Sequence, residues 1–161
     1  MTSNKILNLE QAKNAVETWK KNQQCVVFTN GCFDILHLGH IDYLEKAKLK
    51  GDKLIIGLNS DNSVRKLKGN QRPINHLMAR SRMLAAIEFV DLVIGFDEDT
   101  PLMLINTLLP DVLVKGGDYA KENIVGAESV LAAGGTVAVI EFTDGYSTTK
   151  LINLKNNRCF L

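Results

Sequence analysis

The sequence carries almost no net charge. Its 161 residues include 19 Lys and Arg against 18 Asp and Glu, a formal charge of +1. Binding a nucleic-acid polymer draws on a broad positive field, so a globally basic nucleic-acid binder is not expected. Aromatic residues make up only 6% and offer no evident platform for stacking bases. We therefore expect no nucleic-acid partner, although a local basic patch is compatible with this sum.

Cysteines are also scarce. The three are Cys25, Cys32 and Cys159, and no two of them have the CxxC spacing. An odd count without close pairs argues against a disulfide framework and against a zinc ribbon. A cytoplasmic, reducing environment is the simplest expectation.

Long apolar runs and the common phosphate-loop motifs are absent too. No segment approaches the roughly 18 apolar residues of a membrane helix. The N-terminal stretch is interrupted by polar residues, so we expect neither a signal peptide nor a membrane partner. Neither GxxxxGK[ST] nor GxGxxG occurs, which excludes the usual signatures of nucleotide loops.

What the sequence does have is 45% hydrophobic residues in a length typical of one domain. Short apolar runs alternate with helical patterns. The spacing predicts strands at 25–29, 53–58, 91–96, 111–117 and 136–142, and helices at 9–22, 38–49, 76–89, 100–109, 126–133 and from 147 onward. This order predicts an α/β fold, a doubly wound, five-stranded parallel sheet with helices on both faces. Ligands of such sheets bind beyond the carboxyl ends of the strands.

The segment TNGCFDILHLGH, residues 29–40, follows the first predicted strand. His37 and His40 are three positions apart at a helix start and therefore share one face. The helix N-terminus favours anions, so the two imidazoles suit a polyphosphate. Gly31 and Gly39 would let the backbone approach a ligand closely. A zinc site formed by Cys32 and both histidines, or two histidines that only cap the helix, are the alternatives.

A basic connection follows the second predicted strand. Between Ser60 and Arg82, six basic residues face one acid, Asp61. The segment KLKG, residues 66–69, is predicted to be a mobile loop that closes over a triphosphate. Arg80, within the next helix, could hold phosphate in a two-pronged contact. The alternative is an ordinary solvated basic face.

Two further segments lie at predicted strand ends. The paired glycines of VKGGDY, residues 114–119, allow close approach to a base or ribose, and Asp118 can accept a hydrogen bond there. The segment GYSTT, residues 145–149, opens a helix with hydroxyls that either cap it or bind phosphate. A plain glycine turn and a plain helix cap are the alternatives.

Taken together, TNGCFDILHLGH, NSD, KLKG, RPIN, VKGGDY and GYSTT resemble the HxGH-motif nucleotidyltransferase superfamily. In this order they are most similar to the adenylyltransferase domain of bifunctional heptose kinase/adenylyltransferases. The resemblance implies a Rossmann-like nucleotidyltransferase domain over 1–161, with a leading helix in 1–24, a catalytic core in 25–154 and a tail in 155–161. It also implies a stand-alone version without the kinase domain.

The resemblance implies roles for individual residues. Catalytic roles fall to His37, His40, Lys66, Lys68 and Arg80. Nucleotide binding falls to Thr29, Asn30, Gly31, Cys32, Phe33, Gly39, Lys115, Gly116, Gly117, Asp118, Tyr146, Ser147, Thr148 and Thr149. Sugar-phosphate binding is assigned to Asp34, Asn59 and Asp61. Tyr146 departs from the family pattern, which often has a smaller residue there.

The implied reaction joins ATP and D-glycero-D-manno-heptose 1-phosphate into ADP-heptose and pyrophosphate, for lipopolysaccharide or another heptose glycan. Mg²⁺ is expected mainly on the phosphate oxygens of ATP, with no protein ligand assigned. A homodimer is also implied by relatives. The alternatives are a cytidylyltransferase acting on a polyol or amino-alcohol phosphate, and a nucleotide-binding module without catalysis.

Overall fold

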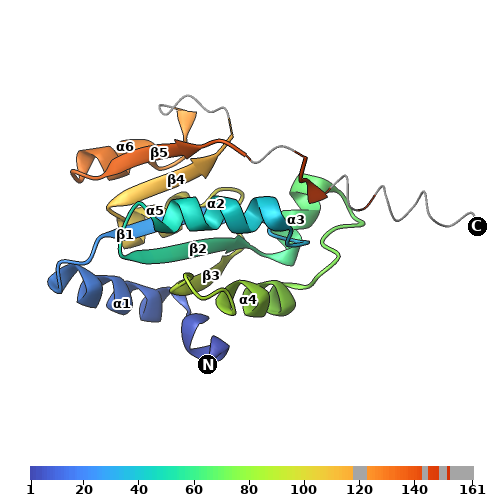
Figure 1. Ribbon diagram of the computed structural model, residues 1–161, viewed down its shortest axis with the longest axis horizontal. Coiled ribbons are helices and arrows are strands. Elements are labelled where there is room, and N and C mark those ends of the chain that lie inside the picture. The colour runs from blue at the N-terminus through green and yellow to red at the C-terminus, as the bar shows by residue number, and fades with distance from the viewer. Residues whose placement is uncertain (118–122, 143–144, 149–151, 153–161) are drawn as a thin grey trace, which may run out of the picture.

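A five-stranded parallel sheet organises the computed structural model, which describes residues 1–117, 123–142, 145–148 and 152. The strands are β1 (Val26–Gly31), β2 (Lys53–Asn59), β3 (Leu92–Phe96), β4 (Val112–Gly116) and β5 (Thr136–Ile140). Their spatial order is β3-β2-β1-β4-β5, so β1 lies at the centre (Figure 1). The predicted α/β class and parallel sheet are confirmed.

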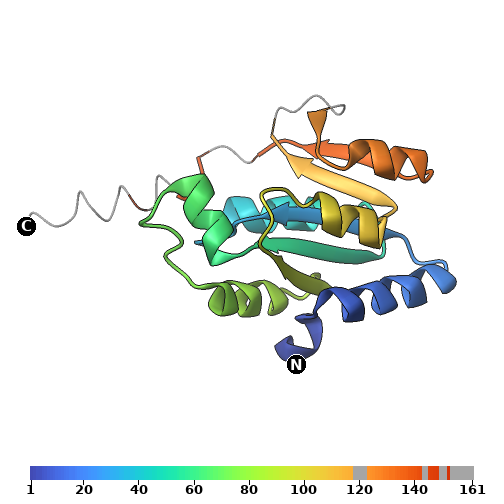
Figure 2. The same cartoon turned by 180° about the vertical axis from the view of Figure 1, so that it is seen from behind.

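Helices cover both faces of this sheet. They are the 3-10 helix η1 (Thr2–Lys5) and the α-helices α1 (Leu9–Lys21), α2 (Leu38–Lys48), α3 (Asp61–Lys68), α4 (Leu77–Ala85), α5 (Leu102–Leu108) and α6 (Ala127–Ala132). One buried cluster joins α1, α5 and α6 to the sheet, and a second joins α2 and α4 to its other face. Figure 1 looks onto α2, and Figure 2 onto α5, on the opposite side.

The two-residue period of β1 explains why one strand serves both layers. Val26 and Phe28 belong to the cluster under α1 and α5, whereas Val27 belongs to the cluster under α2. All three side chains are fully buried. Alternate residues of a strand point to opposite faces, so a continuous apolar run marks a strand that is covered on both sides.

The strand order reverses at β1, and this positions the functional site. From β1 the chain continues through β2 to β3 on one side and then returns to β4 on the other. In open sheets of this kind the connections leave a crevice at the reversal, beyond the carboxyl ends of the strands. The connection from β1 to α2 and the end of β4 therefore border the same crevice.

One expectation was wrong at the level of local structure. The segment 66–69, predicted to be a loop, forms the last turn of α3 and the residue that ends it. Ser60 caps this helix by accepting a hydrogen bond from Ser63 N, and Gly69 ends it with φ of +94°. The helix buries only one apolar side chain, that of Val64, so hydrophobic spacing gives little sign of it. The predicted last helix, from 147 onward, lies largely outside the described residues.

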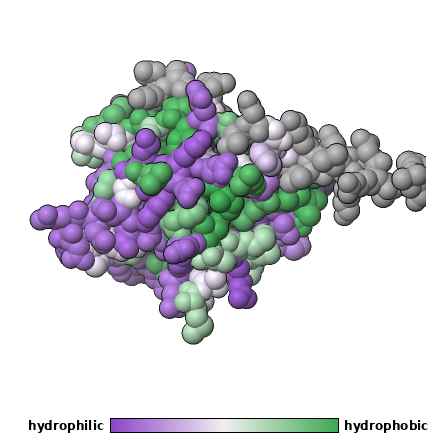
Figure 3. All heavy atoms as spheres, viewed as in Figure 1, coloured by the Kyte–Doolittle hydropathy of each residue, from purple (hydrophilic) through white to green (hydrophobic). Residues whose placement is uncertain are grey.

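The surface is unevenly divided between polar and apolar side chains. Figure 3 shows apolar surface gathered on one side of the face that carries α2 and α4, with polar surface over much of the rest. Exposed large apolar residues of α2, of α4 and of the stretch before α4 include Leu38, Met78 and Ile74. Within the described ranges, no helix is both long and apolar enough to cross a membrane.

Candidate active site

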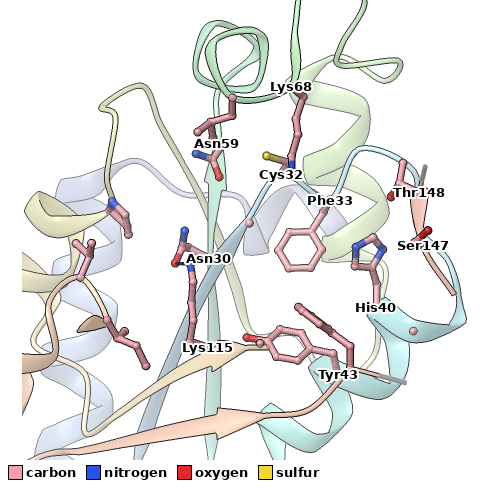
Figure 4. A pocket seen from close by; sticks show the side chains of 18 of the residues that line it. Asn30, Cys32, Phe33, His40, Tyr43, Asn59, Lys68, Lys115, Ser147 and Thr148 are labelled. Atoms are coloured by element: carbon pink, nitrogen blue, oxygen red, sulfur yellow. Dashed lines mark hydrogen bonds between the residues drawn. The ribbon is translucent and has the colours of Figure 1, made fainter. Parts of the chain in front are cut away.

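A cleft of about 730 Å³ opens where the carboxyl ends of the strands meet (Figure 4). It gathers residues from six segments of the chain: the end of β1 with the start of α2, the stretch after β2, residues 99–101 after β3, β4, residues 123–125, and residues near 142–148. The predicted site residues that line it are Asn30, Gly31, Cys32, Phe33, His37, Gly39, His40, Asn59, Lys68, Lys115, Gly116, Tyr146, Ser147 and Thr148. The structure thus brings most of the predicted set together.

The two histidines form a stacked pair at the start of α2. Their ring centroids are 3.8 Å apart and the rings are tilted by 21°. Both Nδ1 atoms are buried, and in the described part of the chain they are the only buried side-chain nitrogen or oxygen atoms without a hydrogen-bond partner. Buried polar groups are rarely left unpaired, so the histidine pair keeps unused hydrogen-bonding capacity.

Burial keeps both imidazoles neutral in the free protein. It lowers the pKa of His37, and it lowers the pKa of His40 to about 4, with a further contribution from the neighbouring His37. A backbone hydrogen bond with Ile35 acts in the opposite direction on His40. A bound polyphosphate would favour the charged imidazoles and raise both pKa values. The pair can therefore gain positive charge when an anion arrives.

Gly39 keeps the backbone between the histidines compact. A Cβ at this position would lie 3.2 Å from Nδ1 of His37 and 3.1 Å from Cβ of Tyr146. Either neighbour would have to move to admit it. Glycine at this position therefore leaves room for the His37 ring and for the segment carrying Tyr146.

Two lysines bring positive charge to the cleft, one from a strand and one from a helix. Lys115 leaves β4 and donates a hydrogen bond to Oδ1 of Asn30 at 3.2 Å. Burial lowers the pKa of Lys115, and among the described residues no carboxylate is paired with it. Lys68 enters from the end of α3 and lies toward Cys32 and Asn59 (Figure 4). Both ammonium groups are available to anionic ligands.

Tyr43 is a cleft residue that the sequence analysis missed. Its hydroxyl shares a hydrogen bond of 2.6 Å with the hydroxyl of Thr29 and lies 3.5 Å from the Val114 carbonyl. Burial raises the pKa of Tyr43 to about 12, so the phenol is neutral. Its place three residues after His40, on the same side of α2, was the available signal. Thr29 itself is fully buried and supports the cleft from below.

Arg80 lies behind the cleft and not in it. Its guanidinium is fully buried and donates to the carbonyls of Cys32, Asn59 and Asn75 at 2.7–2.8 Å. The fourth hydrogen bond goes to Asp61 Oδ1 at 2.7 Å. Because the side chain is fully buried, a direct contact of Arg80 with phosphate would require the surrounding residues to move. Burial alone would raise the pKa of Asp61, but hydrogen bonds from Arg80 first, and from His76, lower it.

Other residues of the basic connection and its neighbours also differ in whether they line the cleft. Lys66 does not line the cleft; it is exposed and pairs at 2.9 Å with Asp99, which does line it. Asp34 and Asp61 do not line the cleft either, because both carboxylates are used by neighbouring donors. Arg72, which the sequence analysis left without a role, does line it. Sequence alone gave no sign of which basic side chain would turn inward.

The remaining predictions lie at the edge of the cleft or beyond the description. Gly117 follows the cleft residue Gly116, with φ of +105°, and donates a hydrogen bond to the Ile140 carbonyl at 3.0 Å. Asp118 and Thr149 lie outside the described residues. In the ranges that are described, no three His, Cys, Asp or Glu side chains form a metal-holding group, which removes support for zinc bound by Cys32 and the histidines.

Comparison with known proteins shows which family has a sequence similar to this chain. Residues 28–154 match the family described as cytidylyltransferase-like. The chain is 53% identical over 149 residues to the bifunctional protein HldE of Geobacter metallireducens, an alignment that covers 92% of this chain and 30% of that protein. It is 55% identical over 148 residues to the bifunctional protein HldE of Marinomonas sp., with coverage of 92% and 30%. The chain thus spans less than a third of the length of these curated relatives.

Two solved structures have a similar fold. A lipopolysaccharide core biosynthesis protein from Thermoplasma volcanium has a TM-score of 0.60 and 29% identity, covering 77% of this chain and 99% of its own. The pantoate-beta-alanine ligase of Francisella tularensis has a TM-score of 0.61 and 16% identity, covering 94% and 76%. The second likeness shows the Rossmann-like α/β fold alone.

Proposed function

Because this chain belongs to the cytidylyltransferase-like family of nucleotidyltransferases, we propose that it transfers AMP from ATP to D-glycero-D-manno-heptose 1-phosphate. The products are ADP-heptose and pyrophosphate, for use in lipopolysaccharide or another heptose glycan. Support for the sugar comes from relatives named HldE, in which about half of the aligned residues are identical to those of this chain. Support for the chemistry comes from the cleft.

The stacked histidine pair is the observation that carries the proposal. Two neutral imidazoles with unpartnered nitrogens lie at the N-terminal end of α2, inside a cleft that also holds two lysines. Such an arrangement suits a polyphosphate, because helix N–H groups and imidazoles can follow the charge that builds on a leaving pyrophosphate. Neutral imidazoles add no positive charge to the cleft before the substrate binds.

The proposed step is a single displacement at phosphorus. An oxygen of the sugar 1-phosphate attacks the α-phosphorus of ATP, and the bond from that phosphorus to the oxygen bridging to the β-phosphate breaks. The electron pair leaves with pyrophosphate. A phosphomonoester is largely dianionic at neutral pH, since its second pKa is near ~6, and the attack therefore needs no general base. The barrier is mainly electrostatic, because one anion must approach another.

The residues of the cleft divide this work. His37 and His40, with the first turn of α2, would hold the leaving phosphates, and Ser147 and Thr148 lie on the same side (Figure 4). Lys115 would neutralise charge at the end of β4, which remains a prediction. Asp99 is the single carboxylate residue among the described lining residues, and it is paired with a lysine. Mg²⁺ would therefore be held mainly by phosphate oxygens and water, where it would neutralise charge.

The decisive experiment identifies the product. Purified protein is incubated with ATP or CTP and with either heptose 1-phosphate or a polyol or amino-alcohol phosphate. Pyrophosphate release is followed, and the mass of the nucleotide product is measured by mass spectrometry. We expect release with ATP and a product with the mass of ADP-heptose. Release only with CTP and a polyol or amino-alcohol phosphate would favour the alternative that the family description keeps open.

A second outcome separates catalysis from binding alone. ATP that binds in calorimetry but yields no pyrophosphate with any acceptor would make the chain a nucleotide-binding module. The homodimer implied by relatives stays a prediction, and sedimentation of the purified chain tests it.

A further inference from the structure

The segment RPIN, residues 72–75, is fastened to the loop after β1 by one carboxylate. Asp34 is almost fully buried and accepts hydrogen bonds from Ile74 N at 2.9 Å and Asn75 N at 2.8 Å. The same carboxylate accepts a third bond from Nε of Arg72. In return, Asn75 Nδ2 donates to the Asp34 carbonyl at 2.7 Å. The Arg72 side chain is therefore held by a contact that uses only one edge of its guanidinium.

The Arg72 side chain also reaches the cleft. The Arg72 side chain is 16% exposed and lines the cleft wall. Throughout the described residues its two Nη groups have no hydrogen-bond acceptor, whereas the guanidinium of Arg80 has four. An arginine fixed by its Nε and open at both Nη groups presents the geometry that grips a phosphate with two parallel bonds.

The net positive charge on the side of the cleft lined by Arg72 comes from Lys68. Asp34 cancels the charge of Arg72, but within the described ranges Lys68 has no carboxylate partner. Burial raises the pKa of the Cys32 thiol, and Lys68, then Arg80 and Arg72, oppose that rise, so these cations surround Cys32. Figure 4 shows Lys68 and Cys32 on a different side of the cleft from His40, Ser147 and Thr148. The cleft thus has two separate walls that can receive anions.

We propose that Arg72 and Lys68 form the receptor for the phosphate of the acceptor substrate, with Asp34 as the residue that positions Arg72. The inference rests on the proposed function, in which two anions meet. The attacking oxygen must approach the α-phosphorus roughly in line with the leaving pyrophosphate. If the side of the cleft with His37 and His40 holds the leaving phosphates, the acceptor phosphate must bind on another side. The side with Arg72 carries a guanidinium that can bind it. Arg72 then selects a phosphate-bearing acceptor.

Under this inference Asp34 positions Arg72, whereas the sequence analysis assigned it to sugar-phosphate binding. Its carboxylate oxygens are already occupied by three donors, so it has little capacity to bind a sugar directly. Burial would raise the pKa of Asp34, but hydrogen bonds from Asn75 N, Ile74 N and Arg72 lower it, and the carboxylate stays charged near neutral pH. A permanently charged anchor fixes the direction of the guanidinium.

The test compares Arg72→Met and Arg72→Lys with the wild type. Steady-state pyrophosphate release gives KM for heptose 1-phosphate and for ATP. We expect the acceptor KM to rise roughly 10- to 100-fold in Arg72→Met, the usual effect of losing a charged hydrogen bond. Arg72→Lys keeps the charge but loses the two-pronged contact, and we expect it to recover only part of that loss. The dissociation constant of ATP should change by less than about twofold.

Arg82→Met is the matched control, because Arg82 is an exposed arginine on α4 outside the cleft. It should leave both KM values unchanged. Equal acceptor KM values in folded Arg72→Met and the wild type would overturn the inference, and so would an increase confined to the KM of ATP. Circular dichroism of each variant checks folding, and Arg72→Lys decides the question if Arg72→Met does not fold.

Titration with inorganic phosphate separates this inference from the proposed function. If the wild type consumes ATP with heptose 1-phosphate, the KM comparison decides the role of Arg72. If it does not, the proposed function fails, and calorimetric titration of phosphate into the protein saturated with a non-hydrolysable ATP analogue decides instead. Phosphate binding that is lost in Arg72→Met but kept in Arg82→Met would support the receptor. Absence of phosphate binding to the wild type, or binding unchanged by Arg72→Met, would overturn it.

Discussion

The connection from β1 into the first turn of α2, residues 32–40, and the connection from β2 into α4, residues 60–80, carry similar-looking functional residues but use them differently. In the first, two half-buried histidines line the cleft, and their buried Nδ1 atoms have no hydrogen-bond partner. In the second, the fully buried guanidinium of Arg80 uses four of its five N–H groups on three carbonyls and Asp61. The first connection has hydrogen-bonding capacity left for a ligand. The second uses most of its capacity to hold the cleft together.

The difference teaches that charge in a sequence motif does not by itself indicate contact with substrate. A buried arginine with four partners stabilises the walls of a site, whereas an imidazole with an unpaired ring nitrogen keeps hydrogen-bonding capacity for a ligand. The four predictions below test this distinction, beginning with the residue whose removal should have the largest effect.

Replacing Arg80 by Met should destabilise the fold. The change leaves Asp61 without its buried counter-ion, and it leaves the Cys32 and Asn59 carbonyls without donors. Breaking a buried pair in this way typically costs about 3–5 kcal/mol, measured as the free energy of unfolding in urea. Arg82→Met on the same helix is the control and should be near neutral. A stable Arg80→Met variant with weakened ATP binding would contradict the comparison and place Arg80 on phosphate.

Replacing His40 by Ala should act on turnover instead of stability. We expect kcat for pyrophosphate release to fall by roughly 10²- to 10³-fold, as on loss of one group that stabilises developing charge. The dissociation constant of ATP should change much less, because the contact strengthens in the transition state. Calorimetry of ATP binding measures that part. Unchanged turnover would remove His40 from the mechanism.

Replacing Lys68 and Lys66 separately should give unequal results. Lys68 lines the cleft, whereas Lys66 is exposed and paired with Asp99. We expect Lys68→Ala to raise the KM of one of the two substrates several-fold, the effect of losing about one contact with a charged group. We expect Lys66→Ala to leave kcat and both KM values unchanged. Steady-state assays of both variants measure this. Equal losses in the two variants would show that α3 moves as a unit over the substrate, as the predicted mobile loop implied.

The smallest expected effect is a pH dependence of stability. The pKa of His40 lies near 4 in the folded protein, below its usual 6.5. Between these values the unfolded chain binds more protons, so this stabilisation is complete above about pH 6.5 and is lost as the pH falls toward 4. The Tm without ATP should therefore drop between pH 7.5 and pH 5, and drop less in His40→Gln. Identical profiles for the two proteins would show that His40 is not buried in its neutral form.

Much of the fold could be predicted from sequence because it depends on local, periodic patterns. Each predicted strand appears in the sheet with its ends shifted by only a few residues. The missed helix α3 is the exception, since it depends on the Ser60 cap and on Gly69 more than on apolar spacing. The histidine pair was also readable, because residues three apart at a helix start share a face whatever surrounds them.

The sequence by itself determined the alternation of strands and helices, the parallel sheet and the position of the histidines at the mouth of β1. Only the tertiary structure decided which cations reach the cleft. That choice depends on carboxylates far along the chain: Asp61 holds Arg80 from 19 residues away, Asp99 holds Lys66 from 33, and Asp34 holds Arg72 from 38. Side-chain pairing follows distance in space, and folding alone sets that distance.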